Sequence, residues 1–197
     1  MFKVAVTGGI GSGKSTLCDI FRKSGVPIYN SDEHAKRLMN ENADIRRDII
    51  SNFGEQCYIN GDLNREYLSS IVFSDREKLS LLNSIVHPRV ITDFELWATV
   101  QDAPFVILEC AILFEANFYK YIDVSICVLA PLPLRIARVI SRDGLTKEQV
   151  ESRIASQISD DEIHRRSTYC VVNIDRDDLE NAASMLSKKI AYEASKN

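Results

Sequence analysis

The chain has 197 residues, of which 45% are hydrophobic and 26% are charged, and its formal net charge is −4. This length and hydrophobic content suffice for one domain with a full core and room for an insertion. The acidic balance argues against a general nucleic-acid-binding protein, which normally carries a basic excess. The five cysteines form no C-x-x-C pair, so they indicate neither a disulfide framework nor a zinc site. We see no signal peptide and no apolar run of the roughly 18 residues that a membrane span needs, and therefore expect a cytoplasmic protein with no membrane partner.

The chain begins with a strand that leads into a glycine-rich turn. Lys3–Val6 is a short apolar run that stops at Thr7 and Gly8, which is typical of a buried strand. From Gly8 the spacing is G-x-x-x-x-G-K-S, the P-loop pattern. All the spaced positions match, so we disfavour the alternative of a glycine-rich turn that merely joins a strand to a helix.

The residue types of this loop suit phosphate binding. Glycines let backbone N–H groups close around phosphate oxygens, and the helix that starts near Lys14 points its unpaired N–H groups at the same anion. We expect Lys14 to reach the β- and γ-phosphates of ATP, and the Ser15 hydroxyl to bind Mg²⁺. The residues expected to bind ATP here are Gly8, Gly9, Gly11, Ser12, Gly13, Lys14, Ser15 and Thr16.

A second strand, Val26–Tyr29, follows the first helix and ends shortly before Asp32. A strand, helix and strand of this length predict a βαβ unit and hence a parallel sheet. Asp32 then lies at the carboxyl end of a strand, where ligands bind in open α/β sheets. Two roles stay open and can coexist: Asp32 takes part in the chemistry, or it is the N-cap of a helix that begins at Glu33.

Residues 33–98 are mostly helical by pattern. The segment is longer than a connection between the second and third strands of a parallel sheet needs to be, so we interpret it as a substrate-side insertion. Ser74 and Glu77 predict a capping box. The helix that follows is expected to end at His87, because Pro88 biases the residue before it away from helix. Taken alone, a single histidine at a helix end is more often structural.

A third strand, Phe105–Leu108, ends at Glu109. Glu109 either supports Mg²⁺, as a Walker-B carboxylate does, or is a polar residue without a metal role. In the segment that follows, we expect Leu113 and Phe114 to pack and Glu115 to face the cleft.

A fourth strand, Val124–Leu129, precedes a helix that carries Arg135, Arg138 and Arg142 and stops at Gly144. These arginines either form a solvated helix face or belong to a lid over residues 132–166 that closes on phosphates. We favour the lid, because arginines that clamp transferring phosphoryl groups recur in such sites.

The end of the lid and the C-terminal part of the chain show further helical signals. Thr146 and Gln149 predict a second capping box. Val150, Ile154 and Ile158 then form an apolar stripe on the next helix. A fifth strand over residues 170–174 precedes the last helix.

With these elements placed, the sequence resembles dephospho-coenzyme A kinases over nearly its whole length. The motifs that carry the resemblance are VTGGIGSGKST, LNREYLSSIVFSD with LLNSIVHPRV, ILFE at 112–115, and RVISRDGLTKEQVESRIASQ at 138–157. The resemblance implies an α/β P-loop kinase unit over residues 1–197, with three layers, a five-stranded parallel sheet, and the helical insertion and lid described above. It also implies transfer of the γ-phosphoryl group of ATP, with Mg²⁺, to the ribose 3′-hydroxyl of dephospho-coenzyme A, the last step of coenzyme A synthesis. Another small-molecule kinase and a nucleotide-binding switch are the rival interpretations.

The resemblance implies roles for individual residues by position. Asp32 matches the aspartate that takes or orients the hydroxyl proton, and the catalytic group also includes Lys14, Arg138 and Arg142. Asp32, His87, Arg89 and Glu115 fall on the acceptor side, and Asn173 lies in the part expected near adenine.

Four places in the chain depart from the family pattern. Asn30 stands where the family often has a second acid, and Ala111 replaces a proline. His164 stands where lysine is common, and Asp175 stands where glycine is common. These departures leave the predicted transfer machinery in place.

Overall fold

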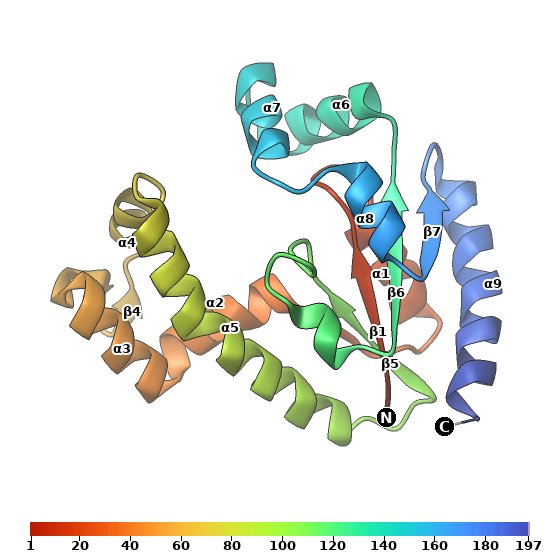
Figure 1. The fold of residues 1–197 in the computed structure, drawn as a ribbon, viewed down its shortest axis with the longest axis horizontal. Helices are drawn as coiled ribbons and strands as arrows, with labels where there is room; N and C mark the ends of the chain where they lie inside the picture. The colour runs from red at the N-terminus through yellow and green to blue at the C-terminus, as the bar shows by residue number, and fades with distance from the viewer. Residues whose placement is uncertain (197) are drawn as a thin grey trace. The chain divides into compact units, whose positions relative to one another are not determined.

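The computed structural model describes residues 1–196. The chain forms two compact units, one made of Met1–Tyr29 with Ala98–Asn197 and the other of Asn30–Trp97. Figure 1 labels their helices and strands along the chain. Among the helices of residues 1–196, none is both long and apolar enough to cross a membrane.

The main sheet has five strands in the order β2-β5-β1-β6-β7. They are β1 (Phe2–Thr7), β2 (Ile28–Asn30), β5 (Phe105–Glu109), β6 (Val124–Leu129) and β7 (Tyr169–Val172). The central strand β1 pairs in parallel with β5 and β6, and β6 pairs in parallel with β7. Val4, Ala5 and Val6 are fully buried, as expected for a strand that is covered on both faces. The predicted α/β class with a parallel sheet is confirmed.

The register of the sheet places the carboxyl ends of β1, β5 and β6 side by side. Val6 is the partner of Glu109, and Thr7 is the partner of Cys127. Because parallel strands end on the same side, the carboxyl ends of β5 and β6 lie beside the point where β1 enters the P-loop.

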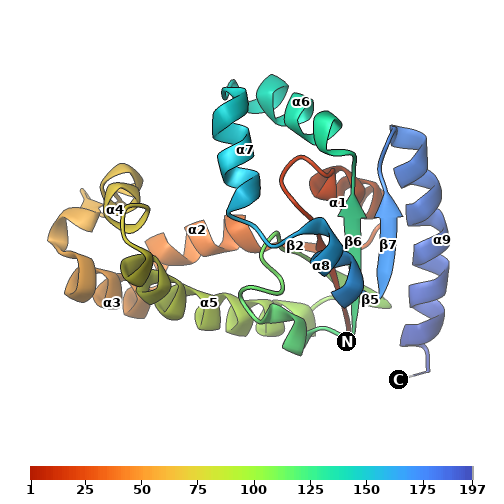
Figure 2. The ribbon, with the colours of Figure 1, turned by 45° about the horizontal axis from the view of Figure 1, so that its top comes forward.

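Helices α1 (Lys14–Lys23) and α9 (Arg176–Ala194) pack on the sheet through one apolar cluster. Leu17 and Phe21 of α1 and Leu179 of α9 are almost completely buried there with residues of β1, β5 and β6. Figures 1 and 2 show α9 running alongside the edge strand β7. Burial of this shared face stabilises both helices more than their propensities do.

Three helices and a short turn complete the first unit. The helices are α6 (Leu132–Asp143), α7 (Lys147–Ala155) and α8 (Asp160–Arg166), and the 3₁₀ turn η2 spans Phe118–Tyr121. Helix α6 ends at Gly144, where φ is 66°, and Thr146 and Gln149 form the predicted capping box. Ile158 lies beyond the end of α7, so its predicted place on that helix is wrong: the chain turns at Ser156 before the stripe is complete.

The second unit is mainly helical. Its elements are α2 (Ser31–Glu41), α3 (Ala43–Phe53), η1 (Glu55–Cys57), β3 (Tyr58–Ile59), β4 (Asp62–Leu63), α4 (Arg65–Val72) and α5 (Arg76–Thr99). Strands β3 and β4 pair in an antiparallel hairpin, and its turn includes Asn60 and Gly61, both with positive φ. The expectation that residues 33–98 are mostly helical did not include these short strands.

Two local predictions for this unit are wrong. Asp75, rather than Ser74, accepts the N–H groups of Glu77 and Lys78 at the start of α5. Helix α5 also continues through Pro88 instead of ending there.

Side-chain burial explains why α5 continues. Proline removes one helical N–H donor, the one that would otherwise reach the carbonyl of Ser84 four residues earlier. Val86, Val90 and nearby apolar residues are buried on both sides of Pro88. This burial offsets the cost of the interruption.

Candidate active site

The P-loop connects β1 to α1 and is shaped by glycines. Gly11 has φ of 77° and Gly13 has φ of 104°, values that favour glycine strongly. A Cβ on Gly11 would collide with the backbone of Arg135, and a Cβ on Gly13 would collide with the side chain of Asn173. The glycines therefore allow both the backbone turn and the close approach of other elements.

The side chain of Lys14 lies back along this loop. Its Nζ donates to the carbonyl oxygens of Gly8 at 2.8 Å and Gly9 at 3.2 Å. The N–H of Ser12 also donates to the carbonyl of Gly9. These bonds give the loop a closed form around the ammonium group.

Ser15 and Glu109 are brought together from opposite halves of the sequence. The Ser15 hydroxyl donates to Glu109 Oε1 at 2.5 Å, and Glu109 is 7% exposed. Hydroxyl and carboxylate oxygens are the hard ligands that suit Mg²⁺. In the part of the chain that the structure describes, no group of three or more His, Cys, Asp or Glu side chains is arranged to hold a metal ion. A hydroxyl and a carboxylate together suit an ion that takes its other ligands from phosphate oxygens and water.

A cavity of about 340 Å³ lies against the P-loop and α6. Its lining residues are Gly11, Gly13, Lys14, Ser15, Thr16, Arg138, Val139 and Arg142. The structure thus brings two predicted lid arginines into the cavity that the P-loop also lines. Arg142 also pairs with Asp143 through Nε at 2.7 Å, and this hydrogen bond raises the pKa of Arg142 and lowers the pKa of Asp143.

Asn173 is buried against the P-loop, with 4% of its surface exposed. Its Nδ2 donates to the carbonyl of Ser12 at 2.7 Å, and its Oδ1 accepts from Arg138 Nη2 at 3.4 Å. Arg138 also donates to the carbonyl of Ile174 at 3.1 Å. The segment after β7 is thereby connected to both the P-loop and α6.

Arg135 differs in its surroundings from Arg138 and Arg142, the other two arginines of α6. It is 2% exposed and contacts the P-loop, whereas Arg142 is exposed. In the sequence-based prediction, Arg135 belongs to the same group as Arg138 and Arg142. The available signal was position: Arg135 lies four residues before the buried Val139 and so on the same, inward face of the helix.

The start of α2 differs from the predicted cap. Asn30 is the N-cap, and its Oδ1 accepts from the N–H groups of Asp32 at 3.0 Å and Glu33 at 3.1 Å. The interpretation of Asp32 as the N-cap is therefore wrong, because α2 begins two residues earlier and asparagine fills the capping position. Asp32 lies exposed in the first turn.

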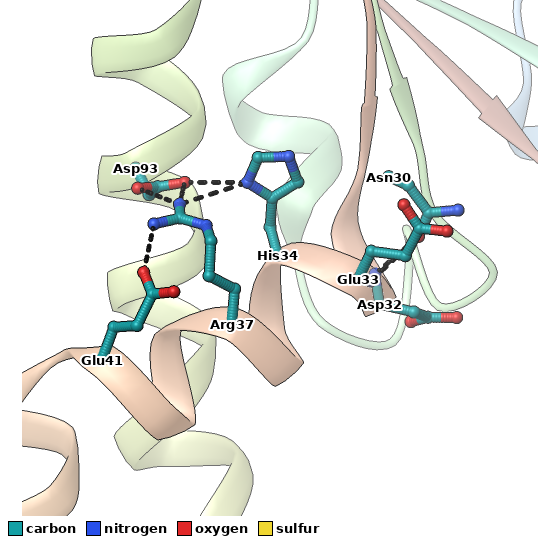
Figure 3. A network of polar contacts seen from close by, with 7 residues as sticks. All are labelled: Asn30, Asp32, Glu33, His34, Arg37, Glu41 and Asp93. Carbon is teal, nitrogen blue, oxygen red and sulfur yellow. Dashed lines mark hydrogen bonds and ion pairs between the residues drawn. The ribbon is translucent and has the colours of Figure 1, made fainter.

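A polar network joins α2 to α5 within the second unit (Figure 3). Asp93 accepts from Arg37 Nη2 at 2.8 Å and contacts His34 Nδ1 at 3.2 Å, and Arg37 also pairs with Glu41. Burial and the charge of Arg37 lower the pKa of His34. Figure 3 shows the carboxylate of Asp32 pointing away from this network. No local pattern in the sequence predicts this network, because its partners lie 56 and 59 residues apart.

The residues predicted on the acceptor side occupy different elements. His87 and Arg89 lie on α5; burial lowers the pKa of His87, and Arg89 Nη2 donates to Asp48 at 2.6 Å. Glu115 is exposed in the segment after β5 and accepts from the N–H of Ile158 at 3.4 Å. Leu113 and Phe114 beside it are buried, as predicted.

Comparisons with known proteins agree with these features. The sequence profile of the CoaE family, described as dephospho-CoA kinase, matches residues 2–178. The dephospho-CoA kinase of Salinibacter ruber is 40% identical over 177 residues, which cover 88% of this chain and 89% of the relative. That of Bacteroides fragilis is 38% identical over 172 residues, which cover 87% and 84%. The crystal structure of TT1252 from Thermus thermophilus has 33% identity and a TM-score of 0.82 over 95% of this chain and 97% of that chain. By these similarities, the chain belongs to the dephospho-CoA kinase family.

Proposed function

We propose that this chain transfers the γ-phosphoryl group of ATP to the ribose 3′-hydroxyl of dephospho-coenzyme A, the last step of coenzyme A synthesis. The observation that carries the proposal is the shared cavity of the P-loop and the lid arginines in a member of this kinase family. In the reaction, the hydroxyl oxygen bonds to the γ-phosphorus, the bond to the β–γ bridging oxygen breaks, and ADP leaves. The hydroxyl loses its proton. Because ATP is plentiful in the cytoplasm, we place the reaction there.

The P-loop and the lid supply the positive charge that this transfer needs. The loop amides and Lys14 bind the β- and γ-phosphates, while Arg138 and Arg142 stabilise charge on the transferring group. Both arginines line the same cavity as Lys14. Positioning and charge neutralisation account for most of the catalysis in phosphoryl transfer.

Mg²⁺ fits the oxygen pair formed by Ser15 and Glu109. Ser15 would bind the ion directly, and Glu109 would support it as a Walker-B carboxylate does. The 2.5 Å bond between the two side chains favours this role for Glu109 over that of a polar residue without a metal role. When bound, the ion neutralises charge on the phosphate oxygens.

Asp32 is assigned to the acceptor hydroxyl, whose proton it accepts or orients. Its exposed carboxylate is not used for helix capping, since Asn30 fills that role. We assign His87, Arg89 and Glu115 to acceptor binding and Asn173 to the adenine side, as the family resemblance implies. Asn173 also holds the P-loop in place, because its Nδ2 donates to the carbonyl of Ser12.

An acceptor screen tests the function. Purified protein with ATP and Mg²⁺ is offered dephospho-coenzyme A, a nucleoside, a nucleoside monophosphate or no acceptor, and the product is identified by mass spectrometry and phosphorus NMR. We expect strong turnover with dephospho-coenzyme A and a 3′-phosphorylated product. A higher kcat/KM for a nucleoside monophosphate would instead indicate another small-molecule kinase, and hydrolysis without any acceptor preference would indicate a nucleotide-dependent switch.

A further inference from the structure

Arg135 is a buried arginine near the start of α6. Its Nε donates to the carbonyl of Ile10 in the P-loop at 2.8 Å, and its Nη1 donates to Asp160 Oδ2 at 2.5 Å. Burying a guanidinium is costly unless it is paired and hydrogen-bonded. Both conditions hold here, so the side chain is fixed between the P-loop and α8.

The contact with Ile10 determines the direction of a second group. The Ile10 carbonyl and the Gly11 N–H belong to the same peptide unit, and in a planar trans peptide these two groups point in opposite directions. By holding the carbonyl, Arg135 turns the Gly11 N–H away from itself. Gly11 lines the cavity of the P-loop, where an N–H donor is useful to a phosphate.

The neighbouring peptides are held in related ways. Asn173 Nδ2 donates to the carbonyl of Ser12, which shares a peptide unit with the Gly13 N–H. The N–H of Ile10 instead donates to Gln157 Oε1 at 2.9 Å. Side chains from outside the loop thus hold the carbonyls of Ile10 and Ser12, which precede Gly11 and Gly13, and also occupy the N–H of Ile10.

The packing around Gly9 supports a specific fit. A Cβ on Gly9 would collide with the guanidinium of Arg135, so the guanidinium lies directly against the loop backbone. An arginine that served only the charge of Asp160 would not need this close approach, because Asp160 lies on α8 and its side chain is 38% exposed.

We propose that Arg135 is a positioning residue that presets the Gly11 amide for the nucleotide phosphates, with Asp160 holding the guanidinium in place. The inference rests on the proposed binding of ATP at the P-loop. It predicts that loss of Arg135 weakens the binding of nucleotides that carry β- and γ-phosphates, the groups that a Walker-A backbone and its lysine bind. AMP, which lacks both, depends less on the preset amide.

The test compares Arg135→Met with the wild type by calorimetric titration of ATP and AMP, together with kcat and KM for ATP. Methionine keeps the apolar stem and removes every donor. It leaves Asp160 without its ion-pair partner, but the Asp160 side chain is 38% exposed, so water solvates the carboxylate and limits the cost to the fold. We expect about tenfold weaker ATP binding and a higher KM, the effect of one charge-assisted hydrogen bond. AMP affinity should change less than about twofold. Arg135→Lys should recover part of the loss, because it restores a donor and the charge.

Two further variants separate positioning from general damage. Asp160→Asn keeps Arg135 and should weaken ATP binding in the same direction but less. Arg165→Met is the matched control, since Arg165 is exposed on α8 and donates to the carbonyl of Asp161 in its own helix; its ATP and AMP affinities should equal those of the wild type.

A folded Arg135→Met protein with the wild-type ratio of ATP to AMP affinity overturns the inference. If that variant does not fold, the same unchanged ratio in Arg135→Lys and Asp160→Asn overturns it. Failure of ATP binding at the P-loop, on which the inference rests, has a different signature, because the wild-type protein itself would then bind ATP no more tightly than AMP. Failure of the proposed acceptor would instead appear in the acceptor screen and leave the ratio of ATP to AMP affinity unchanged.

Discussion

Ser15 and Glu109 are joined by a 2.5 Å hydrogen bond between the first turn of α1 and the end of β5. The bond depends on the parallel register, in which Glu109 is the partner of Val6, next to the P-loop. A hydroxyl and a carboxylate thus meet at the edge of the sheet where we place the phosphates and Mg²⁺. The relationship makes Glu109 testable as a supporting metal residue.

Replacing Glu109 with glutamine keeps its size and an oxygen acceptor for Ser15 but removes the negative charge. We expect the Mg²⁺ concentration for half-maximal activity to rise about 10-fold to 100-fold, the usual effect of losing a supporting metal partner. The measurement is kcat across a Mg²⁺ titration at saturating ATP. Glu180→Gln, on the exposed face of α9, is the matched control. An unchanged titration for folded Glu109→Gln would leave Glu109 as a polar residue without a metal role.

Removing the guanidinium of Arg142 should lower kcat by about 10-fold to 10³-fold, since a clamping arginine stabilises charge that develops during transfer. Arg142→Ala should retain the fold, because this side chain is 63% exposed and its ion pair with Asp143 is a surface pair. Steady-state kinetics with ATP and dephospho-coenzyme A measure the effect. Arg153→Ala, at an exposed arginine of α7, should behave as the wild type. Full activity of Arg142→Ala would leave Arg142 as part of a solvated helix face.

Much of the framework was predictable because its causes are local. The P-loop spacing from Gly8, the apolar run of β6 and the glycine stop of α6 at Gly144 all follow from nearby residue types. Long-range burial decided the rest. Helix α5 passes Pro88 because apolar side chains on either side of it are buried, a fact that the local Pro signal does not contain.

In the site, too, local motifs predict some residues and long-range contacts determine others. Lys14, Arg138 and Arg142 could be identified from motif and resemblance, and the structure brings them to one cavity. For Arg135 the sequence offers only its position four residues before Val139. Its carbonyl partner Ile10 is 125 residues away, so the contact with the P-loop is visible only in the structure. Charge alone does not show which arginine of a helix faces inward.

Acidification should destabilise the second unit through His34. Burial lowers the pKa of His34 in the folded chain, so the unfolded chain binds the proton more tightly. The contribution of neutral His34 to folding stability is therefore fully present above the ordinary histidine pKa of about 6.5. It is lost as the pH falls through the lowered pKa that His34 has in the folded chain. The charge of Arg37 reinforces the effect, and hydrogen bonding to Asp93 opposes it.

The measurement for His34 is the free energy of unfolding from urea titrations across this pH range. His34→Gln, which cannot titrate, should show a smaller loss of stability on acidification than the wild type. His164→Gln is the matched control, since His164 lies on α8 in the other unit and is exposed. Equal pH dependence in the wild type and His34→Gln would contradict the prediction.

Replacing Asp32 with asparagine separates the chemistry of Asp32 from the structure of α2. Asn30 provides the cap, so Asp32→Asn should cost at most about 0.3–1 kcal/mol, the value of one acidic group in the first turn of a helix. If Asp32 accepts or orients the hydroxyl proton, kcat should fall by about 10² to 10⁴, and by less if the transition state is loose. Asn30→Ala should show the converse, with about 0.5–2 kcal/mol lost from stability. The measurements are kcat, ATP affinity and thermal unfolding for both variants. ATP affinity should change little in Asp32→Asn, because Lys14 and the loop amides are intact. Normal turnover in a stable Asp32→Asn protein would remove Asp32 from the mechanism.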